Sequence, residues 1–290
     1  MPVLLKEAVE KLKVTPGGTY VDCTVGTGGH AESILEESSP DGSLLAIDRD
    51  TKAIEIAERR LERFRGRVRF FRRRFGELEG ILREAHIGAV DGFLFDLGVS
   101  AIQIEDRSRG FSYRLDGPLD MRMDQDDEFT AADLLNKLEA EELERIIRAY
   151  GEERWSRRVA RSVVRERMKG GVESTGQLAS IVRRSVGGKL AHKSLARVFQ
   201  ALRIRVNDEL QELETGLASA SENLKKGGRI VVISYHSLED RIVKRKFLEL
   251  SEGSGRTLRL ITKKVVKPSQ AEIKANKRAR SARLRAAEAV

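Results

Sequence analysis

The strongest constraint on the fold is an alternation of strand-like and helix-like segments over residues 3–100. Short apolar segments rich in β-branched residues alternate with amphipathic segments of helical period. The expected strands are residues 19–23, 43–48, 68–71 and 90–97, and the expected helices between them are residues 30–37, 51–64 and 77–85. Because strands that alternate with helices build parallel sheets covered on both faces, we predict an α/β fold with a doubly wound, mainly parallel sheet.

This alternation is interrupted in the middle of the chain. Residues 105–129 show no clear period, and the segments that follow are amphipathic and separated by glycines: 141–150, 153–168, 177–186 and a long helix over about 194–224. The α/β pattern then resumes with a strand at 229–235, a helix at 237–250 and a candidate strand at 257–264. We therefore predict one sheet domain, residues 1–106 with 207–290, interrupted by a helical insert at 107–206.

The net charge is concentrated at one end of the chain. The sequence has 54 Lys and Arg against 45 Asp and Glu, a formal net charge of +9. The last forty residues carry eleven of these cations and three of these acids, so +8 of the charge lies there. An almost neutral body with a cationic end suggests a polyanionic partner such as RNA, although a solvated polar tail over residues 267–290 explains the same pattern.

Cysteine content and hydropathy constrain the chemistry and the compartment. Cys23 is the single cysteine, so the chain can form neither an internal disulfide nor a cysteine-based zinc site, and we expect no metal. The N-terminus lacks the apolar core of a signal peptide, and no apolar run approaches the ~18 residues that span a bilayer. We therefore expect a cytoplasmic protein that has no membrane partner.

A glycine-rich loop follows the first expected strand, where residues 21–30 read VDCTVGTGGH. In a doubly wound sheet, ligands bind at the carboxyl end of this strand. Glycines let a ligand approach the backbone, and the next helix offers free N–H groups at its N-terminus. Gly26, Gly28 and Ala31 fit only the looser G-x-G-x-x-A form of the dinucleotide fingerprint. The loop alone therefore leaves the nucleotide-like ligand open.

Two acids narrow the choice of ligand. Asp48 ends the second strand about 20 residues after the glycines, where a carboxylate accepts ribose hydroxyls and disfavours NADP. The alternative role for Asp48, capping the next helix, is already filled by Asp50. Asp22 stands too early for the pyrophosphate of NAD but suits the sulfonium and ammonium groups of S-adenosylmethionine. We therefore expect S-adenosylmethionine as cofactor, with an NAD-dependent oxidoreductase as the alternative.

Two further strand ends supply candidate catalytic groups. Asp96 ends the fourth strand beside the switch point of the sheet, although capping a turn explains an Asp there equally well. His236 follows the fifth strand and is a candidate base or phosphate contact. The competing interpretation is that Ser237 and Asp240 form a capping box for the next helix, with His236 packed behind it.

The longest motifs together resemble one family. In chain order they are VDCTVGTGGH, AIDRD, DGFLFDLGVS, RGFSYRLDGPLDMRMD, FQALRIRVNDEL, ISYHSLEDRIVK and RARSARLRAAE. This set resembles the bacterial S-adenosylmethionine-dependent methyltransferases that modify the exocyclic N4 of a cytidine in the decoding region of 16S ribosomal RNA. The resemblance covers residues 3–288. It implies a Rossmann-like class I methyltransferase sheet with an inserted all-helical domain, and 16S rRNA as substrate, within a small ribosomal subunit particle.

The resemblance also implies site residues. The family's cofactor pattern maps here onto Gly28, Gly29, His30, Asp48, Phe75, Asp96 and Gln103. Asp96 is thus both a cofactor residue and, with His236, a candidate catalytic residue. Among the departures from the family pattern, Lys277 stands where proline is usual.

Clusters of arginine supply candidate RNA contacts. The strongest are in the cationic tail: Arg278, Arg280, Arg283 and Arg285. Residues 154–169 of the insert hold six Arg and one Lys beside Trp155, whose ring can stack on a flipped base. Residues 59–74 hold nine Arg, which a solvated face with Glu partners explains more simply. A non-catalytic RNA-binding assembly factor is the second alternative, but such a protein needs neither the glycine loop nor Asp48.

Overall fold

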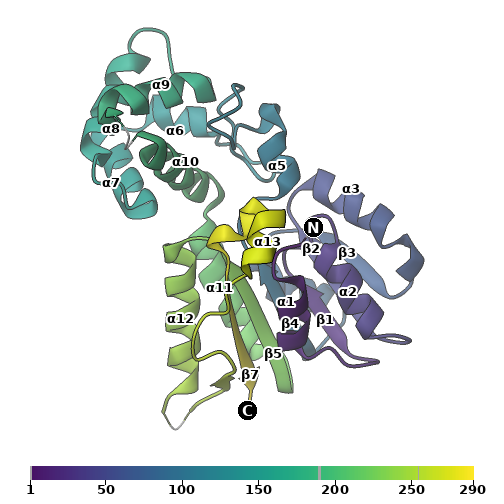
Figure 1. Cartoon of the computed structure of the whole chain (residues 1–290). Helices are drawn as coiled ribbons and strands as arrows, with labels where there is room; N and C mark the ends of the chain where they lie inside the picture. The colour runs from purple at the N-terminus through teal and green to yellow at the C-terminus, as the bar shows by residue number, and fades with distance from the viewer. Residues whose placement is uncertain (1, 189–190, 254) are drawn as a thin grey trace. The chain divides into compact units, whose positions relative to one another are not determined.

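The computed structural model describes residues 2–188, 191–253 and 255–290, and the chain divides into two compact units (Figure 1). The sheet unit comprises Met1–Gly98 and Leu210–Val290, and the helical unit comprises Val99–Glu209. The domain bounds predicted from the sequence, 1–106 with 207–290 for the sheet domain and 107–206 for the insert, stay a prediction, and so does the RNA-binding role of the insert. No helix in the described ranges is long and apolar enough to cross a membrane.

Seven strands of the described chain form one sheet in the order β3-β2-β1-β4-β5-β7-β6. Their bounds are β1 (Thr19–Asp22), β2 (Ser43–Asp48), β3 (Val68–Arg72), β4 (Val90–Asp96), β5 (Leu224–Ser234), β6 (Leu258–Leu260) and β7 (Arg283–Ala289). Neighbouring strands are parallel, except that β7 runs antiparallel to both β5 and β6. The order reverses between β1 and β4, where a doubly wound sheet binds its ligand. The predicted α/β fold is confirmed.

Helices cover both faces of this sheet: α1 (Leu5–Leu12), α2 (Gly29–Glu37), α3 (Thr51–Arg60), α4 (Leu78–Glu84), α11 (Glu209–Glu222), α12 (Ser237–Ser251) and, at the edge of the unit, α13 (Gln270–Ala275). One buried cluster packs α1, α2 and α3 against one face, and a second packs α4, α11 and α12 against the other. Consecutive strand residues enter opposite clusters, as Leu44 and Leu45 do. Each central strand is therefore apolar on both sides, which is why it reads as a continuous hydrophobic run.

The helical unit packs around its own buried core. Its helices are α5 (Ala101–Glu105), α6 (Ala131–Lys137), α7 (Ala140–Gly151), α8 (Ser156–Arg167), α9 (Thr175–Val186) and α10 (Ala191–Asn207). The segment between α5 and α6 lacks a hydrophobic period because buried polar side chains hold its backbone. Asn207 donates to the carbonyl of Met121 and accepts from the N–H of Met123, and Arg109 donates to the carbonyls of Arg122 and Met123.

The long helix predicted over about 194–224 is wrong in one respect, because the chain forms two helices there. Helix α10 ends at Asn207 and α11 begins at Glu209. Asp208 between them has a positive φ of 47°, a left-handed conformation that interrupts the helical hydrogen bonds. Asp is among the residues that adopt this conformation, but the apolar period continues across it and conceals the break.

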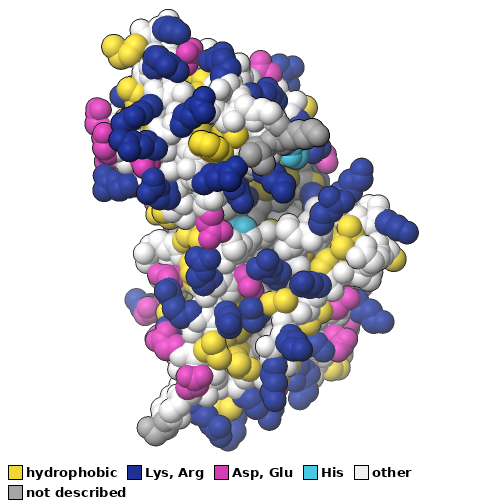
Figure 2. All heavy atoms as spheres, turned by 60° about the vertical axis from the view of Figure 1, so that its left-hand side comes forward, with side chains coloured by type: hydrophobic (Ala, Val, Ile, Leu, Met, Phe, Trp, Pro, Cys, Tyr) yellow, Lys and Arg dark blue, Asp and Glu magenta, His cyan; other side chains and the backbone are white. Residues whose placement is uncertain are grey.

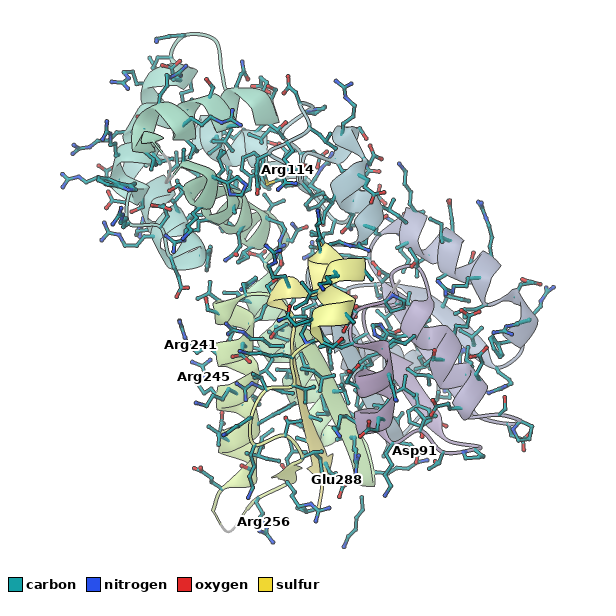
Figure 3. The ribbon with its side chains drawn as sticks, viewed as in Figure 1. Asp91, Arg114, Arg241, Arg245, Arg256 and Glu288 are labelled. Atoms are coloured by element: carbon teal, nitrogen blue, oxygen red, sulfur yellow. The ribbon has the colours of Figure 1, made fainter. Side chains whose placement is uncertain are left out.

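The polar tail predicted over residues 267–290 is also wrong, because its end is β7. Leu284 and Ala286 are fully buried and alternate with Arg283 and Arg285, a strand period. Near the end of this strand, Glu288 (labelled in Figure 3) accepts a hydrogen bond from Arg229 Nε at 2.9 Å. Alanine is uncommon in strands, so an Ala-rich segment resembles a tail until the sheet supplies neighbours on both sides.

Candidate functional site

The glycine loop is fixed to the end of the neighbouring strand by Asp48. Asp48 Oδ2 accepts the N–H of Gly26 at 2.9 Å, and Oδ1 accepts the N–H of Asp50 at 3.0 Å. Asp50 itself caps α3, as predicted, by accepting the N–H of Lys52. Gly28 caps α2 with a φ of +79°, where any side chain would be strained. The loop therefore presents backbone at the carboxyl end of β1, and Asp48 sets its conformation.

Gly29 and His30 contact the N-terminal segment of the chain. A Cβ on Gly29 would lie 2.3 Å from Pro2 Cγ, so only glycine lets this segment pack on the start of α2. His30 is buried, and its Nε2 lies 3.0 Å from the carbonyl oxygen of Val3. Both residues lie in the predicted cofactor loop, and their contact with a cofactor stays a prediction.

Asp22, at the end of β1, is the most constrained acid of the site. It is 1% exposed, and its Oδ1 accepts the N–H of Thr24 at 3.1 Å. Its Oδ2 is buried without a hydrogen-bond partner among the described residues. Burial, opposed by the Thr24 hydrogen bond and reinforced by the charges of Asp96 and Asp48, raises the pKa of Asp22 to about 8. An acceptor oxygen left open in this way fits a cationic or hydrogen-bond-donating ligand.

Asp96, at the end of β4, is held by three neighbours. Its Oδ1 accepts the Tyr235 hydroxyl at 2.7 Å, and its Oδ2 lies 3.6 Å from His30 Nδ1. Its backbone N–H donates to Thr24 Oγ1 at 2.6 Å. Burial raises the pKa of Asp96, while His30, the Tyr235 hydrogen bond and Arg278 act in the opposite direction. The carboxylate is 22% exposed, so it remains open to a ligand.

Together the strand ends make an acidic site. Asp22, Asp48 and Asp96 end the neighbouring strands β1, β2 and β4, on the same edge of the sheet. Such a group of carboxylates favours a ligand that carries positive charge and hydroxyl donors, and it repels phosphate. This is the chemistry of S-adenosylmethionine, with its sulfonium, ammonium and ribose, rather than that of a dinucleotide with its pyrophosphate. The residues present therefore fit the predicted cofactor.

His236 is the N-cap of α12, and the predicted capping box of Ser237 and Asp240 is wrong. The Nδ1 of His236 faces the N–H of Glu239 at 3.4 Å, and its Nε2 lies 3.0 Å from Glu239 Oε1. Glu239 Oε2 in turn accepts the N–H groups of Tyr235 and His236 at 2.7 and 3.2 Å. His236 thus has a local structural role at the carboxyl end of β5, and its catalytic role stays a prediction.

Phe75 and Gln103 lie in well-packed surroundings. Phe75 begins a short 3-10 turn after β3, and its ring packs edge-on against Phe95, with 5.6 Å between centroids. Gln103 belongs to the helical unit, where its Oε1 accepts the N–H of Ser100 in a capping box at the start of α5. Their predicted contacts with the cofactor stay predictions.

The four arginines predicted to contact RNA fall into two pairs. Arg278 and Arg280 are exposed on a 3-10 turn, Lys277–Ser281. Arg283 and Arg285 lie on β7 and both donate to Asp240 of α12, at 3.2 Å and 2.7 Å. The second pair is thus engaged in holding β7 against α12.

Trp155 is part of the helical unit's packing. Its ring is half-buried against the core, its Nε1 is buried, and the guanidinium of Arg154 lies 5.1 Å from its ring centroid. Its predicted stacking on a flipped base stays a prediction.

Sequence analysis missed Tyr235 and Thr24, the two hydroxyls that fix Asp96. Tyr235 directly follows β5, next to the candidate residue His236, so the strand-end rule could have identified it. Burial and the adjacent Asp96 raise the pKa of Tyr235, which keeps the hydroxyl protonated as a donor. Thr24 gave no signal, because its contact with Asp96 joins residues 72 positions apart.

Comparisons with known proteins agree with this geometry. The chain is 47% identical to ribosomal RNA small subunit methyltransferase H of Symbiobacterium thermophilum, over 99% of this chain and 95% of that protein. It is 43% identical to the protein of the same name from Clostridium botulinum, over 98% of this chain and 96% of that one. A solved structure from Clostridium thermocellum, described as an rRNA methylase, matches with a TM-score of 0.50 and 12% identity, covering 100% and 99% of the two chains. That last likeness shows the fold alone.

The family comparison decides between the alternatives that the glycine loop left open. The family described as the MraW methylase family matches residues 1–290. A methylase takes S-adenosylmethionine rather than NAD, and it is an enzyme rather than only an assembly factor, in agreement with the acidic site. The chain therefore belongs to the MraW methylase family and is an S-adenosylmethionine-dependent methyltransferase.

Proposed function

We propose that this enzyme methylates the exocyclic N4 of a cytidine in the decoding region of 16S rRNA. The observation that carries the proposal is the group of acids Asp22, Asp48 and Asp96 at the ends of β1, β2 and β4. The names of its relatives support small-subunit rRNA as the substrate. Such a substrate implies action in the cytoplasm, on a small ribosomal subunit particle.

Three parts of the sheet unit would hold the cofactor. When bound, S-adenosylmethionine supplies an electrophilic methyl group. The open Oδ2 of Asp22 accepts from the cationic end of the molecule, and Asp48 accepts ribose hydroxyls beside the loop that it already fixes. Gly28, with its φ of +79°, sets the turn by which the glycine loop enters α2. These residues bind and orient the cofactor, which is the larger part of catalysis for an in-line displacement.

The nucleophile is a weak one, because the N4 lone pair of cytosine is delocalised into the ring. An acceptor at the N4 hydrogens favours a pyramidal amine, and the amine must lose one proton when it is methylated. We assign this proton to Asp96, whose pKa is raised by burial and whose Oδ1 is already bonded to the Tyr235 hydroxyl. Its Oδ2, facing His30 Nδ1 at 3.6 Å, is the oxygen that can take it up. Tyr235 and His30 are positioning residues in this scheme.

Methylation at C5 of cytosine is the chemical alternative, and the structure disfavours it. That reaction needs a thiolate that attacks C6. Cys23 is 1% exposed in the core beside β1, and burial raises the pKa of its thiol well above the usual value. A thiol that is buried and protonated is a poor nucleophile.

The test is a transfer assay on small subunits that lack the modification. With methyl-labelled S-adenosylmethionine, nuclease digestion and separation of nucleosides should place the label in N4-methylcytidine, and Cys23→Ala should transfer it at a rate within about twofold of wild type. Label in 5-methylcytidine, or a folded but inactive Cys23→Ala variant, would overturn the proposal. No transfer to rRNA by protein that binds the cofactor would overturn it too.

A further inference from the structure

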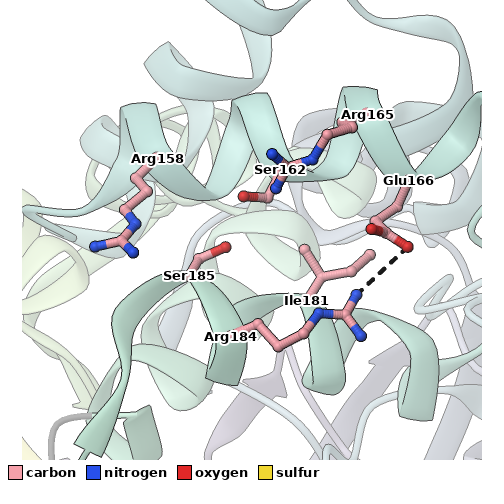
Figure 4. A pocket seen from close by; sticks show the side chains of 7 residues that line it. All are labelled: Arg158, Ser162, Arg165, Glu166, Ile181, Arg184 and Ser185. Atoms are coloured by element: carbon pink, nitrogen blue, oxygen red, sulfur yellow. Dashed lines mark ion pairs between the residues drawn. The ribbon is translucent and has the colours of Figure 1, made fainter.

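The helical unit contains a small cavity between α8 and α9 (Figure 4). Its volume is about 130 Å³, larger than a single water molecule needs. The side chains that line it recur at helical spacing, so each helix turns one face toward the cavity. Helix α8 contributes Arg158, Ser162, Arg165 and Glu166, and α9 contributes Ile181, Arg184 and Ser185.

Ser185 distinguishes this cavity from an ordinary packing gap. It is 3% exposed, and its Oγ is buried with no hydrogen-bond partner among the residues that the structure describes. The hydroxyl is directed into the cavity in Figure 4. A buried hydroxyl left without a partner costs about 1–3 kcal/mol, and native proteins hold few such groups. The cavity therefore has a hydrogen-bond donor that no residue in the described part of the chain engages.

The charge of the cavity favours an anion. Its acid, Glu166, is already balanced, because Lys169 Nζ lies 3.1 Å from Oε1 and Arg184 Nη2 lies 3.4 Å from Oε2. The Lys169 hydrogen bond and the charges of Lys169, Arg184 and Arg165 also lower the pKa of Glu166, so it stays ionised. Arg158 and Arg165 are exposed and make no ion pair within 4 Å among the described residues. The cavity thus presents two guanidinium groups that are not held in close ion pairs among the described residues.

We propose that this cavity binds a phosphodiester group of the RNA substrate. Guanidinium groups bind phosphate oxygens through two parallel N–H donors, and hydroxyls donate to the oxygens that remain. Here Arg158 and Arg165 would supply the first contacts, and Ser162 and Ser185 the second.

The surroundings favour an RNA backbone over a free anion. Arg154, Arg157 and Arg161 continue the row of cations along the start and the exposed side of α8, and Figure 2 shows Lys and Arg spread over the visible face of the helical unit. A row of cations follows a chain of phosphates better than a single ion. The proposal rests on the proposed function for the identity of the polyanion.

The matched pair of variants R158Q/R165Q and R157Q/R161Q tests it in the full chain. Both remove two positive charges from the same helix, but Arg157 and Arg161 are exposed and do not line the cavity. We expect R158Q/R165Q to weaken binding of deproteinised 16S rRNA about tenfold at 100 mM salt and to reduce the slope of log Kd against log salt by about 1. R157Q/R161Q should weaken it less than threefold. Equal losses would mean a general positive field and overturn the proposal.

Ser185→Ala separates binding from folding. Because the hydroxyl has no partner among the described residues, its removal should leave the Tm unchanged or higher, while 16S rRNA binding weakens about threefold to tenfold. Unchanged rRNA binding, or a fall in Tm that accounts for the loss, would overturn the proposal.

Competition with inorganic phosphate distinguishes the two possible ligands, a phosphate of the RNA backbone and a free anion. If phosphate competes with 16S rRNA for the wild-type protein and competes less for Ser185→Ala, the cavity takes an RNA phosphate. Phosphate that binds without displacing RNA identifies a free-anion site and overturns the proposal. The methylation assay tests the proposed function separately. If the wild-type enzyme places label in a nucleoside other than N4-methylcytidine, the proposed function is refuted while the binding results stand. If R158Q/R165Q and Ser185→Ala both bind rRNA normally, only the cavity proposal is refuted.

Discussion

Strand β7 and helix α8 are both rich in arginine, yet they use it differently. On β7, Arg283 and Arg285 both donate to Asp240. Glu288 of the same strand accepts a hydrogen bond from Arg229 of the neighbouring strand β5. On α8, the exposed Arg157, Arg158, Arg161 and Arg165 make no ion pair within 4 Å among the described residues. The charge of β7 therefore stabilises the fold, whereas the charge of α8 is available to a ligand.

The difference teaches that a count of charges along a sequence does not show where an anion binds. The last forty residues carry most of the formal net charge, but part of that charge is neutralised by acids elsewhere in the sheet unit, Asp240 among them. Helix α8 carries five Arg and one Glu, but acids in other segments balance this charge in the sum, so the net charge of the chain does not reveal it. What matters is whether each guanidinium has a partner in space.

The largest expected effect concerns Asp22 in the sheet unit. On the proposed binding mode, Asp22 ionises when the cationic end of the cofactor binds beside it. Asp22→Asn removes this carboxylate, and a hydrogen bond to a charged group contributes about 1.5–3 kcal/mol. We expect cofactor affinity, measured by calorimetry, to fall by about 30-fold or more, with 16S rRNA affinity unchanged. Glu79→Gln, which alters an exposed acid of α4, is the control and should leave both affinities unchanged. Parallel loss of rRNA binding would show that the two regions are not separable.

The pH dependence of stability provides a second test of Asp22. The folded pKa of about 8 lies above the ordinary value of 3.8, so the folded state binds the proton more tightly. Stability from this group is therefore full below about pH 4 and lost as pH rises toward 8. The Tm of Asp22→Asn minus the Tm of wild type should therefore be larger at pH 8.5 than at pH 5. An equal difference at both pH values would show that Asp22 is not buried as a protonated acid.

Much of this contrast was beyond prediction from the sequence. The strands of the sheet were predictable, because β1 to β5 are apolar runs bounded by turns, and so was Asp48, because strand-end acids follow a topological rule. The site at Asp96 was predictable only in part. Asp96 itself is predictable from its position at a strand end, but the Tyr235 and Thr24 hydroxyls that fix it come from distant segments.

The misses share one physical cause, which is that tertiary contacts override local pattern. β7 resembles a polar tail because its Arg–Asp240 pairs and its Ala packing exist only in the folded sheet. The break at Asp208 is hidden because a single left-handed residue does not disturb the apolar period on either side. His236 caps α12 through Glu239, a pair that no common capping box predicts.

The next effect in size tests whether β7 depends on its charge pairs. Asp240→Ala leaves Arg283 and Arg285 without their acceptor at a site where Asp240 is only 14% exposed. We expect a loss of about 2 kcal/mol in the free energy of unfolding, because breaking a partly buried pair leaves an uncompensated charge. For a unit of this size that is a fall in Tm of about 4–8 °C. Glu79→Ala breaks an exposed pair with Arg83 and should change Tm by about 1 °C or less.

The smallest effect separates the two arginine pairs of the C-terminal region. Arg278 and Arg280 are exposed, so R278Q/R280Q should lower rRNA affinity about threefold to fivefold and reduce the salt slope by about 1, with no change in Tm. R283Q/R285Q should instead lower Tm, because Asp240 loses its partners, and leave the salt slope unchanged. Filter binding from 50 to 300 mM salt and thermal unfolding of both variants decide the matter. If R283Q/R285Q flattens the salt dependence as much as R278Q/R280Q does, then β7 contacts RNA as well, and pairing with Asp240 does not withdraw an arginine from the ligand.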